Sequence, residues 1–394
     1  MIKFANRVMD IKGSEIRESY KIMSLPGMIS LAAGSPDPKL YPIEELKDVA
    51  IRARNKGTDA FSYMATEGYG PLREKIAARM QEKMNVDCKT ENIMILTGSQ
   101  QGIEMSAKVF VNEGDYIACE SPSYMGAFTA FNTYLPEYVG VPTDEEGMLP
   151  EELDKILTEN DKVKMIYVIP NFQNPTGHTW TLERRKAFME VVNKHEIPVI
   201  EDDPYGQIRF EGEDIPTLKS MDTEGLVVYL GSFSKILVPG YRVGWVCASD
   251  EIFQKYYLVK QGLDMHSTAS VQVEINEYME IYDLDQHIEK IRATYKKKKD
   301  SMLEAMKESF PKSVTWSKPE GGLFVWVTLP EGKNAKELLN VCIEHKVIFI
   351  SGSAFYPDGG GENTFRMSFA SMDQQVMVEG IRRIGEAMKE FLRE

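Results

Sequence analysis

Short apolar runs alternate with longer amphipathic stretches between residues 92 and 248 of this chain. The apolar runs are short enough for strands, and the stretches between them repeat with the period of a helix. The expected strands include residues 93–96, 116–119, 165–169, 197–200 and 226–230, and the expected helices are residues 100–110, 125–133, 149–157 and 182–195. Strands and helices that alternate at this spacing predict an α/β fold with a doubly wound, mostly parallel sheet.

The pattern changes after about residue 286, where a long charged stretch leads into three further apolar runs. Residues 287–307 carry an apolar stripe at helical spacing, and residues 321–327, 347–350 and 365–369 resemble strands. This order predicts a smaller α+β unit with an antiparallel sheet. Near the other end, a helix is expected over residues 14–24, because Pro26 and Gly27 form a turn signal directly after it.

The charged stretch contains the run Lys296-Lys297-Lys298-Lys299. Taken alone, such a run resembles a nucleic-acid patch. Because it lies on an amphipathic helix, we expect a solvated helix face instead. The formal net charge of −14 points the same way, since nucleic acids and anionic membranes both require a basic surface.

Composition excludes several further classes of function. The four cysteines lie far apart and form no Cys-x-x-Cys pair, which is typical of reduced, buried thiols. The five histidines are scattered without the spacing of a metal site, and neither a Rossmann glycine fingerprint nor a P-loop follows a strand. No signal peptide or transmembrane run is apparent, so we expect a cytoplasmic protein without a metal, a nucleic-acid partner or a membrane partner.

The segment from Ser232 to Trp245 contains the most informative chemistry. It places Ser232, Ser234, Lys235 and Arg242 directly after an apolar strand. A lysine can bond an aldehyde, while two hydroxyls and an arginine fork can hold a phosphate. Pyridoxal phosphate is an aldehyde that carries a phosphate, so the segment suggests a site for this cofactor. The alternative is a solvated lysine near a hairpin, which is the commoner meaning of such a short motif when it stands alone.

Two other polar segments also follow predicted strands. Residues 171–177 read Asn-Phe-Gln-Asn-Pro-Thr-Gly, and residues 201–205 read Glu-Asp-Asp-Pro-Tyr. Ligands of an open α/β sheet bind beyond the carboxyl ends of the strands, so these segments are expected to converge with Lys235. Together they resemble the fold-type I pyridoxal-phosphate aminotransferases of class I and II, over nearly the whole chain from residue 29 to the Arg366 region. The chain is most similar to the 2-aminoadipate and kynurenine aminotransferase group.

This resemblance implies three units. Residues 1–45 form an N-terminal segment with a mobile helix that packs with the small domain. Residues 46–286 form the large domain that binds pyridoxal 5'-phosphate, and residues 287–394 form the small C-terminal α+β domain.

The resemblance also implies which residues hold the cofactor. Gly98 closes a strand and opens a helix, which creates an anion site, and the phosphate ligands are then Ser99, Gln100, Ser232, Ser234 and Arg242. The pyridine ring is expected to contact Asp202 at its nitrogen, Tyr205 and Asn174 at its hydroxyl oxygen, and Tyr124 on its face. Asp203 follows Asp202 on a strand and should point the other way.

Catalysis and substrate binding follow from the same resemblance. Lys235 forms the Schiff base with the cofactor and then acts as the base that moves the substrate proton. Arg366 clamps the substrate α-carboxylate, with Asn174 and Gly34 beside it. Tyr63 matches a tyrosine that reaches the phosphate of a neighbouring subunit, which implies a homodimer, and Arg17 lies on the mobile helix that faces the substrate.

The expected function is a ping-pong transfer of an amino group from an L-amino acid to a 2-oxo acid, with 2-oxoglutarate as the acceptor. The donor carries a 2-aminoadipate, aromatic or aliphatic side chain. Two alternatives stay open at this point, because a fold does not fix a function. One is a lyase or decarboxylase on the same fold, and the other is the aminotransferase-like domain of a MocR-type transcription regulator.

Overall fold

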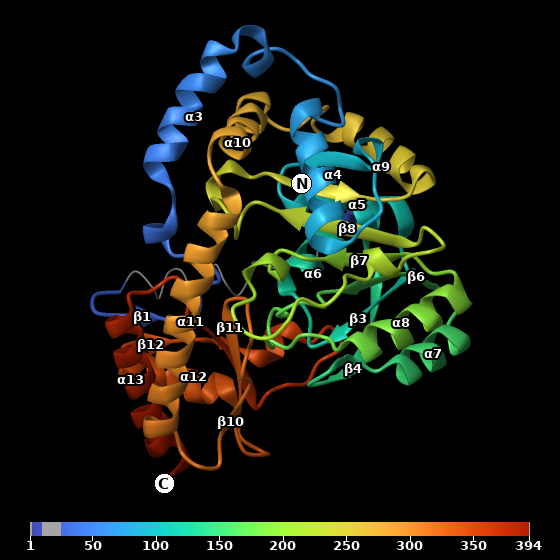
Figure 1. Cartoon of the computed structure of the whole chain (residues 1–394). Coiled ribbons are helices and arrows are strands. Elements are labelled where there is room, and N and C mark those ends of the chain that lie inside the picture. Colours follow the sequence, from blue (N-terminus) through green and yellow to red (C-terminus); the bar gives the residue numbers. More distant parts are fainter. Residues whose placement is uncertain (1, 10–24, 394) are drawn as a thin grey trace.

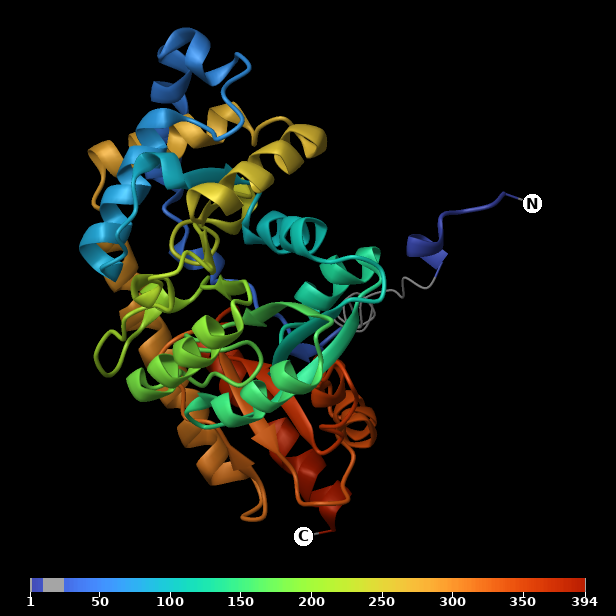
Figure 2. The same cartoon turned by 90° about the vertical axis from the view of Figure 1, so that its right-hand side faces the viewer.

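The computed structural model describes residues 2–9 and 25–393, which form a larger and a smaller part connected by one long helix (Figure 1). The helix expected over residues 14–24 lies outside the described residues. A short helix, α1 (Asn6–Met9), lies beside η4 (Asn132–Tyr134), and Figure 2 shows this end of the chain at the edge of the larger part.

The larger part is built on an eight-stranded sheet with a parallel centre. Its strands, in spatial order, are β2 (Ile93–Leu96), β9 (Gly244–Cys247), β8 (Val227–Ser232), β7 (Val199–Asp202), β6 (Val163–Val168), β3 (Tyr116–Ser121), β4 (Glu137–Asp144) and β5 (Gly147–Met148). The pairs from β8 to β4 are parallel, whereas β2, β9 and β5 pair antiparallel. The predicted doubly wound, mostly parallel sheet is confirmed.

Helices cover both faces of this sheet, which is why its central strands are mostly apolar and buried. The helices of the larger part are α3 (Ile43–Asn55), α4 (Gly70–Met84), α5 (Ser99–Phe110), α6 (Met125–Phe131), α7 (Pro150–Glu159), α8 (Leu182–His195), α9 (Asp250–Leu263) and α10 (Ala269–Ile281). Side chains of β6 alternate between two cores: Tyr167 packs in the core that includes α5, and Ile166 packs in the core beneath α7 and α8. Because side chains alternate along β7 in the same way, the position of Asp202 in the strand decides which face of the sheet its side chain is on.

Short 3-10 turns join several of these elements. They are η1 (Pro38–Leu40), η2 (Gly57–Ala60), η3 (Thr90–Asn92), η5 (Gly206–Ile208), η6 (Lys219–Met221), η7 (Pro239–Tyr241) and, in the smaller part, η8 (Gly352–Phe355).

The smaller part contains the antiparallel sheet that the sequence predicts, and two helices that it did not predict cover this sheet. Its strands, in spatial order, are β10 (Thr315–Trp316), β11 (Phe324–Thr328), β14 (Thr364–Ser368) and β13 (Ile350–Ser351), and its helices are α12 (Ala335–Glu344) and α13 (Gln374–Leu392). The run expected as one strand over residues 347–350 divides between two sheets, because β12 (Val347–Ile348) pairs with β1 (Ile29–Ser30) near the start of the chain. The segment after β1 is thereby held against the smaller part (Figure 1).

The connecting helix α11 (Leu284–Ser309) begins at Asp283, whose side chain accepts a hydrogen bond from the Gln286 backbone N–H. The prediction of a solvated lysine face on this helix is wrong for two of the four lysines in the run from Lys296 to Lys299. Lys298 and Lys299 are each only 5% exposed. Both make ion pairs, Lys298 with Asp37 and Lys299 with Glu211, and such pairing is what makes a buried ammonium tolerable.

Candidate functional site

The polar segments that follow the parallel strands meet at one edge of the large sheet. Asp202 ends β7, Ser232 ends β8, and the loop from Asn171 to Gly177 follows β6. Because β6, β7 and β8 are neighbours and parallel, their carboxyl ends lie side by side. The convergence expected from the sequence is therefore present in the fold.

Lys235 lies three residues beyond β8 and points toward the N-terminal segment. Its Nζ donates a hydrogen bond to the backbone oxygen of Gly34 at 3.0 Å. The pKa of Lys235 is lowered to about 8, mainly by burial and also by the charges of Arg242 and Arg366, while the charge of Asp202 opposes them. An amine with this pKa is partly neutral near pH 8 and can then act as a nucleophile or a base.

Asp202 is 2% exposed and keeps one oxygen without a partner. The Tyr167 hydroxyl donates to its Oδ2 at 2.8 Å, whereas its Oδ1 has no hydrogen-bond partner among the described residues. Burial raises the pKa of this carboxyl to about 7, against the lowering effect of the Tyr167 hydrogen bond. A positively charged N–H donor at Oδ1 would satisfy the atom and favour the ionised carboxylate.

Asp203 faces away from Asp202, as strand alternation predicts. Its Oδ1 accepts hydrogen bonds from Asn171 Nδ2 at 3.0 Å and from the Gly206 backbone N–H at 2.8 Å. Its Oδ2 accepts a hydrogen bond from the Tyr229 hydroxyl at 2.9 Å. Both oxygens of Asp203 are thus already engaged, by the loop after β6, the loop after β7 and strand β8.

The start of α5 packs tightly against the guanidinium of Arg242. Gly98 has a φ of +73°, and a Cβ there would lie 2.6 Å from Arg242 Nη2. Gly244 is equally restricted, since a Cβ would lie 2.8 Å from the Ser99 backbone nitrogen. The absence of side chains at these two glycines therefore lets the Arg242 guanidinium come close to the N–H groups at the start of α5. A cation beside free backbone N–H groups is the arrangement that binds a phosphate.

The serines of the same group are linked to each other. The Ser234 backbone N–H donates to Ser232 Oγ at 3.1 Å, and Arg242 Nη1 donates to Ser234 Oγ at 3.4 Å. Gln100 differs from the others, because its side-chain Nε2 donates to the Gly126 carbonyl at 2.8 Å. This bond uses one of the two N–H groups of the Gln100 side chain and directs that side chain toward α6.

Arg366 on β14 is 2% exposed and is held by neutral groups. Its Nη1 donates to Asn174 Oδ1 at 2.6 Å and its Nη2 to the Ala32 carbonyl at 2.7 Å. The guanidinium lies 4.2 Å from the ring centre of Phe324 and 5.0 Å from that of Phe355. Burial lowers its pKa to about 10. Within the described residues no carboxylate pairs with Arg366 and its Nε has no partner, so an incoming carboxylate would satisfy a buried cation.

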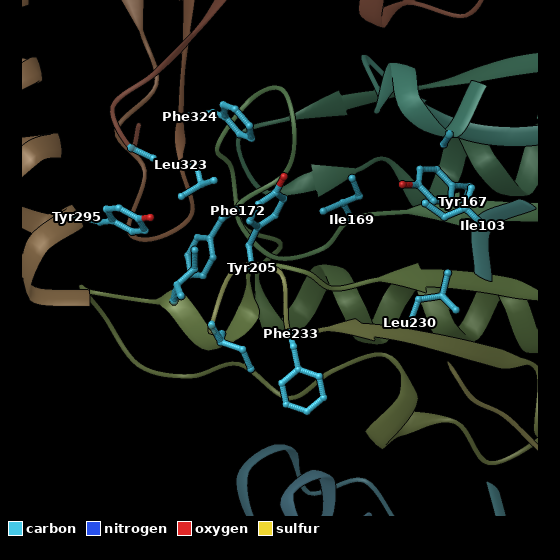
Figure 3. Close-up of a cluster of buried hydrophobic side chains, with 14 of the residues drawn as sticks. Ile103, Tyr167, Ile169, Phe172, Tyr205, Leu230, Phe233, Tyr295, Leu323 and Phe324 are labelled. Atoms are coloured by element: carbon cyan, nitrogen blue, oxygen red, sulfur yellow. The ribbon is translucent and has the colours of Figure 1, made fainter. Parts of the chain in front are cut away.

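Two tyrosines lie near Arg366 and Asp202, whose charges act on the pKa of both hydroxyls. Tyr205 is buried, and its ring meets that of Phe324 edge-on at 5.9 Å (Figure 3). Tyr124 immediately precedes α6, and burial raises its pKa, with a further increase from the charge of Asp202. Both hydroxyls are therefore protonated at neutral pH and can donate hydrogen bonds.

Two predicted residues are not brought into this group. Tyr63 is 85% exposed, and its ring meets the His266 ring edge-on at 5.8 Å. Arg17 lies outside the described residues.

Two residues of the candidate site, Tyr167 and Phe324, were not predicted from the sequence. Tyr167 donates to Asp202, and Phe324 stacks on Arg366; a Cβ on Gly34 would also lie 2.7 Å from the Phe324 ring. Figure 3 shows Phe324 on the side of the small domain and Tyr167 within the large sheet. A tyrosine inside an otherwise apolar strand was the available signal for Tyr167, because a buried hydroxyl needs a partner.

The residues fit pyridoxal phosphate. The unpartnered Oδ1 of Asp202 suits a protonated pyridine nitrogen, and Lys235 would supply the amine for the aldehyde. Ser232, Ser234 and Arg242 at the glycine-lined helix start would supply phosphate donors. Among the described residues there is no cluster of metal ligands and no helix long and apolar enough to cross a membrane.

Comparisons with known proteins agree with this geometry. A family model described as aminotransferase class I and II matches residues 26–384. The chain is 40% identical to aromatic-amino-acid aminotransferase 1 of Thermococcus litoralis, over 99% of this chain and 95% of that protein. The structure of a Pyrococcus horikoshii kynurenine aminotransferase in complex with PMP superposes with a TM-score of 0.95 at 39% identity, covering 99% of this chain and 98% of that one. The α-aminoadipate aminotransferase LysN of Thermus thermophilus, complexed with N-(5'-phosphopyridoxyl)-L-leucine, gives a TM-score of 0.91 at 38% identity with the same coverage.

Proposed function

Because this chain belongs to the class I and II aminotransferases and its cofactor is pyridoxal phosphate, we propose that it moves the amino group of an L-amino acid to 2-oxoglutarate by a ping-pong mechanism. The proposed donors carry a 2-aminoadipate, aromatic or aliphatic side chain. The names of the relatives support this range, since they cover aromatic amino acids, kynurenine and α-aminoadipate.

The observation that carries the proposal is that Lys235 and Arg366 bond the same short segment, at Gly34 O and at Ala32 O, while Asp202 is close enough for its charge to act on Lys235. The charges of Asp202 and Arg366 both act on the pKa of Lys235, so the three functional groups share one site. A nucleophilic amine, a carboxylate for a ring nitrogen and a cation for a substrate carboxylate are the three groups that amino transfer requires.

Substrate binding is assigned to Arg366. The guanidinium retains N–H groups beyond those that bond Asn174 and Ala32, so it can still offer two parallel hydrogen bonds to an α-carboxylate. The faces of Phe324 and Phe355 restrict the plane of the guanidinium. That restriction orients the carboxylate and hence the α-carbon.

Proton transfer is assigned to Lys235 and Asp202. When bound, pyridoxal phosphate withdraws electrons from the substrate α-carbon into its ring. The Oδ1 of Asp202 would hold a proton on the pyridine nitrogen, while Tyr205 and Asn174 would hold the ring hydroxyl oxygen and Tyr124 the ring face. The neutral Nζ of Lys235 can accept the α-proton, and Gly34 O gives that amine a fixed hydrogen-bond acceptor.

We also propose that the enzyme is a cytoplasmic homodimer. Tyr63 would reach the phosphate bound to the partner subunit, which explains why a large aromatic side chain is left exposed here, with Phe61 and Met265 also exposed. The four free cysteines support the cytoplasmic assignment. Arg17 is proposed to meet the distal carboxylate of dicarboxylic substrates, and it lies outside the described residues.

A spectroscopic donor screen tests the proposed function. Each amino acid is added alone to the cofactor-loaded enzyme, and 2-oxoglutarate is added afterwards. The absorbance of the aldehyde form should convert to that of the amine form and then return. Release of CO2, or loss of the donor side chain without this conversion, would instead indicate a decarboxylase or lyase.

A further inference from the structure

A buried lysine network lies behind the start of α5, outside the site residues described above. Lys260 on α9 is 0% exposed, and its Nζ donates to Gln101 Oε1 at 2.9 Å, to Asp264 Oδ1 at 2.9 Å and to Ser267 Oγ at 3.1 Å. Gln101 Oε1 also accepts the Thr97 backbone N–H at 2.9 Å, and Gln101 Nε2 donates to Asp264 Oδ2 at 2.8 Å. The Thr97 hydroxyl completes the network through Asp264 Oδ2 at 3.1 Å.

These contacts fix the two sides of the turn formed by residues 98–100, which we call the phosphate turn. Thr97 precedes the turn and Gln101 follows it, and the two are joined directly by the bond from the Thr97 N–H to Gln101 Oε1. Arg242 packs against Gly98 from the other side. The shape of the phosphate turn therefore depends on Gln101 holding its side-chain position.

Lys260 and Asp264 together hold Gln101 there, and Lys260 contacts both of them: its Nζ donates to Gln101 Oε1 and to Asp264, which in turn accepts from Gln101 Nε2. A buried ammonium keeps its charge only where its donors are satisfied, and Asp264 and Ser267 supply the other two acceptors. Asp264 and Ser267 follow the end of α9, so Lys260 also connects this helix to the start of α5. The two helices lie side by side (Figure 1).

We infer that Lys260 is a positioning residue for the cofactor phosphate: through Gln101 it holds the phosphate turn in the geometry that binds a phosphate dianion. The inference rests on the proposed function of the site. It assigns no contact between Lys260 and the cofactor. His266 lies between Asp264 and Ser267 of the network in the sequence, and its ring contacts Tyr63. Tyr63, which is proposed to reach the phosphate bound to the partner subunit, is therefore next to the same network.

The test compares two ligands that differ only in the phosphate. Full-length protein is stripped of cofactor and titrated with pyridoxal phosphate or with pyridoxal, and binding is followed by absorbance. Lys260→Met should weaken pyridoxal phosphate tenfold or more and leave pyridoxal within about twofold, because pyridoxal does not use the phosphate turn. Lys255→Met is the matched control, since Lys255 is exposed on the same helix, and it should change neither affinity.

A second variant keeps the test decisive if Lys260→Met does not fold. Gln101→Leu removes the bridging side chain and leaves Lys260 with Asp264 and Ser267, and it should produce the same selective loss. In the double variant the loss should not exceed that of the worse single variant, because Lys260 acts through Gln101. An equal loss for both ligands, or no loss for pyridoxal phosphate, would overturn the inference.

The outcome for the unaltered enzyme separates this inference from the proposed function. If the unaltered enzyme binds pyridoxal phosphate no better than pyridoxal, both are wrong. If it prefers pyridoxal phosphate and Lys260→Met keeps that preference, only the role of Lys260 is wrong.

Discussion

Two adjacent aspartates at the end of β7 have different surroundings, which follows from the alternation of side chains along a strand. Asp202 keeps a free oxygen toward the site, whereas both oxygens of Asp203 accept hydrogen bonds from the loop and from Tyr229. The sequence could predict this division, because side chains alternate along a strand. It could not predict that Asp203 would be buried, since its partners come from three different segments.

Replacing each aspartate by alanine should therefore have different effects. Asp202→Ala should lower kcat by orders of magnitude and cost less stability than Asp203→Ala, because it leaves one buried donor, the Tyr167 hydroxyl, unpaired rather than three. Asp203→Ala should cost about 3 kcal/mol of stability, because it leaves buried donors unpaired, with a smaller loss of kcat. Steady-state kinetics and urea denaturation of both variants measure the two effects. The reverse ranking in kcat would refute the assignment of Asp202.

The lowered pKa of Lys235 makes a prediction about pH. Only the neutral amine attacks an aldehyde, so attachment of pyridoxal phosphate to cofactor-free enzyme should speed up as pH rises and level off above about 8. Below that value the rate should fall about tenfold per pH unit. Stopped-flow absorbance across the pH range gives the midpoint. Arg366→Met should move the midpoint upward, because it removes a nearby positive charge. A midpoint near the ordinary lysine pKa of 10.5 would contradict this description.

Helix α11 joins the two parts, and its two buried lysines pair with different carboxylates, Lys298 with Asp37 and Lys299 with Glu211. Lys298 donates to Asp37 Oδ2 at 2.6 Å and to the carbonyls of Ala370 and Met372, each at 2.7 Å. Asp37 lies three residues after Gly34, in the segment whose Gly34 and Ala32 carbonyl oxygens bond Lys235 and Arg366. The pair therefore connects the middle of α11 to the segment that lines the site.

Removing this ammonium should be costly. Lys298→Met leaves the Asp37 carboxylate buried and unpaired, which should lower the free energy of unfolding by about 3–5 kcal/mol. Lys297→Met is the matched control, because Lys297 is exposed one residue away, and it should change stability by less than about 0.5 kcal/mol. Urea denaturation at one protein concentration compares them. Equal effects of the two variants would show that the ion pair adds nothing.

Local pattern predicted the central strands of the large sheet and the helices between them, but it did not predict helices such as α3, α9 and α13 or the contacts between elements. The apolar runs gave β2 and α8 with their observed bounds, because buried strands and amphipathic helices carry a periodic signal. The strand expected over residues 197–200 is shifted to Val199–Asp202, which brings Asp202 onto the strand itself. The lysine run on α11 was misread because Asp37 lies 261 residues from Lys298 in the sequence. Such distant pairing leaves no local trace.

At the scale of the whole molecule, the exposed position of Tyr63 bears on the assembly. If two copies share each site, mixing Lys235→Ala with Tyr63→Phe should place both changes in one site of the mixed dimer and leave the other site intact. Random exchange should then recover about a quarter of the unaltered activity, since half the dimers are mixed and each has one good site. Activity after mixing, compared with the sum of the separate variants, is the measurement. No recovery under conditions where subunits exchange would argue against a shared site.

The central claim is that Lys235 bonds pyridoxal phosphate in a site built for amino transfer. The direct measurement is borohydride reduction of the cofactor-loaded enzyme, followed by peptide mapping by mass spectrometry. We predict a phosphopyridoxyl adduct on the peptide that contains Lys235, and none after prior incubation with an amino donor that the enzyme uses. The Lys235→Ala variant should carry no reducible adduct. An adduct on another lysine, or one that persists in that variant, would contradict the account.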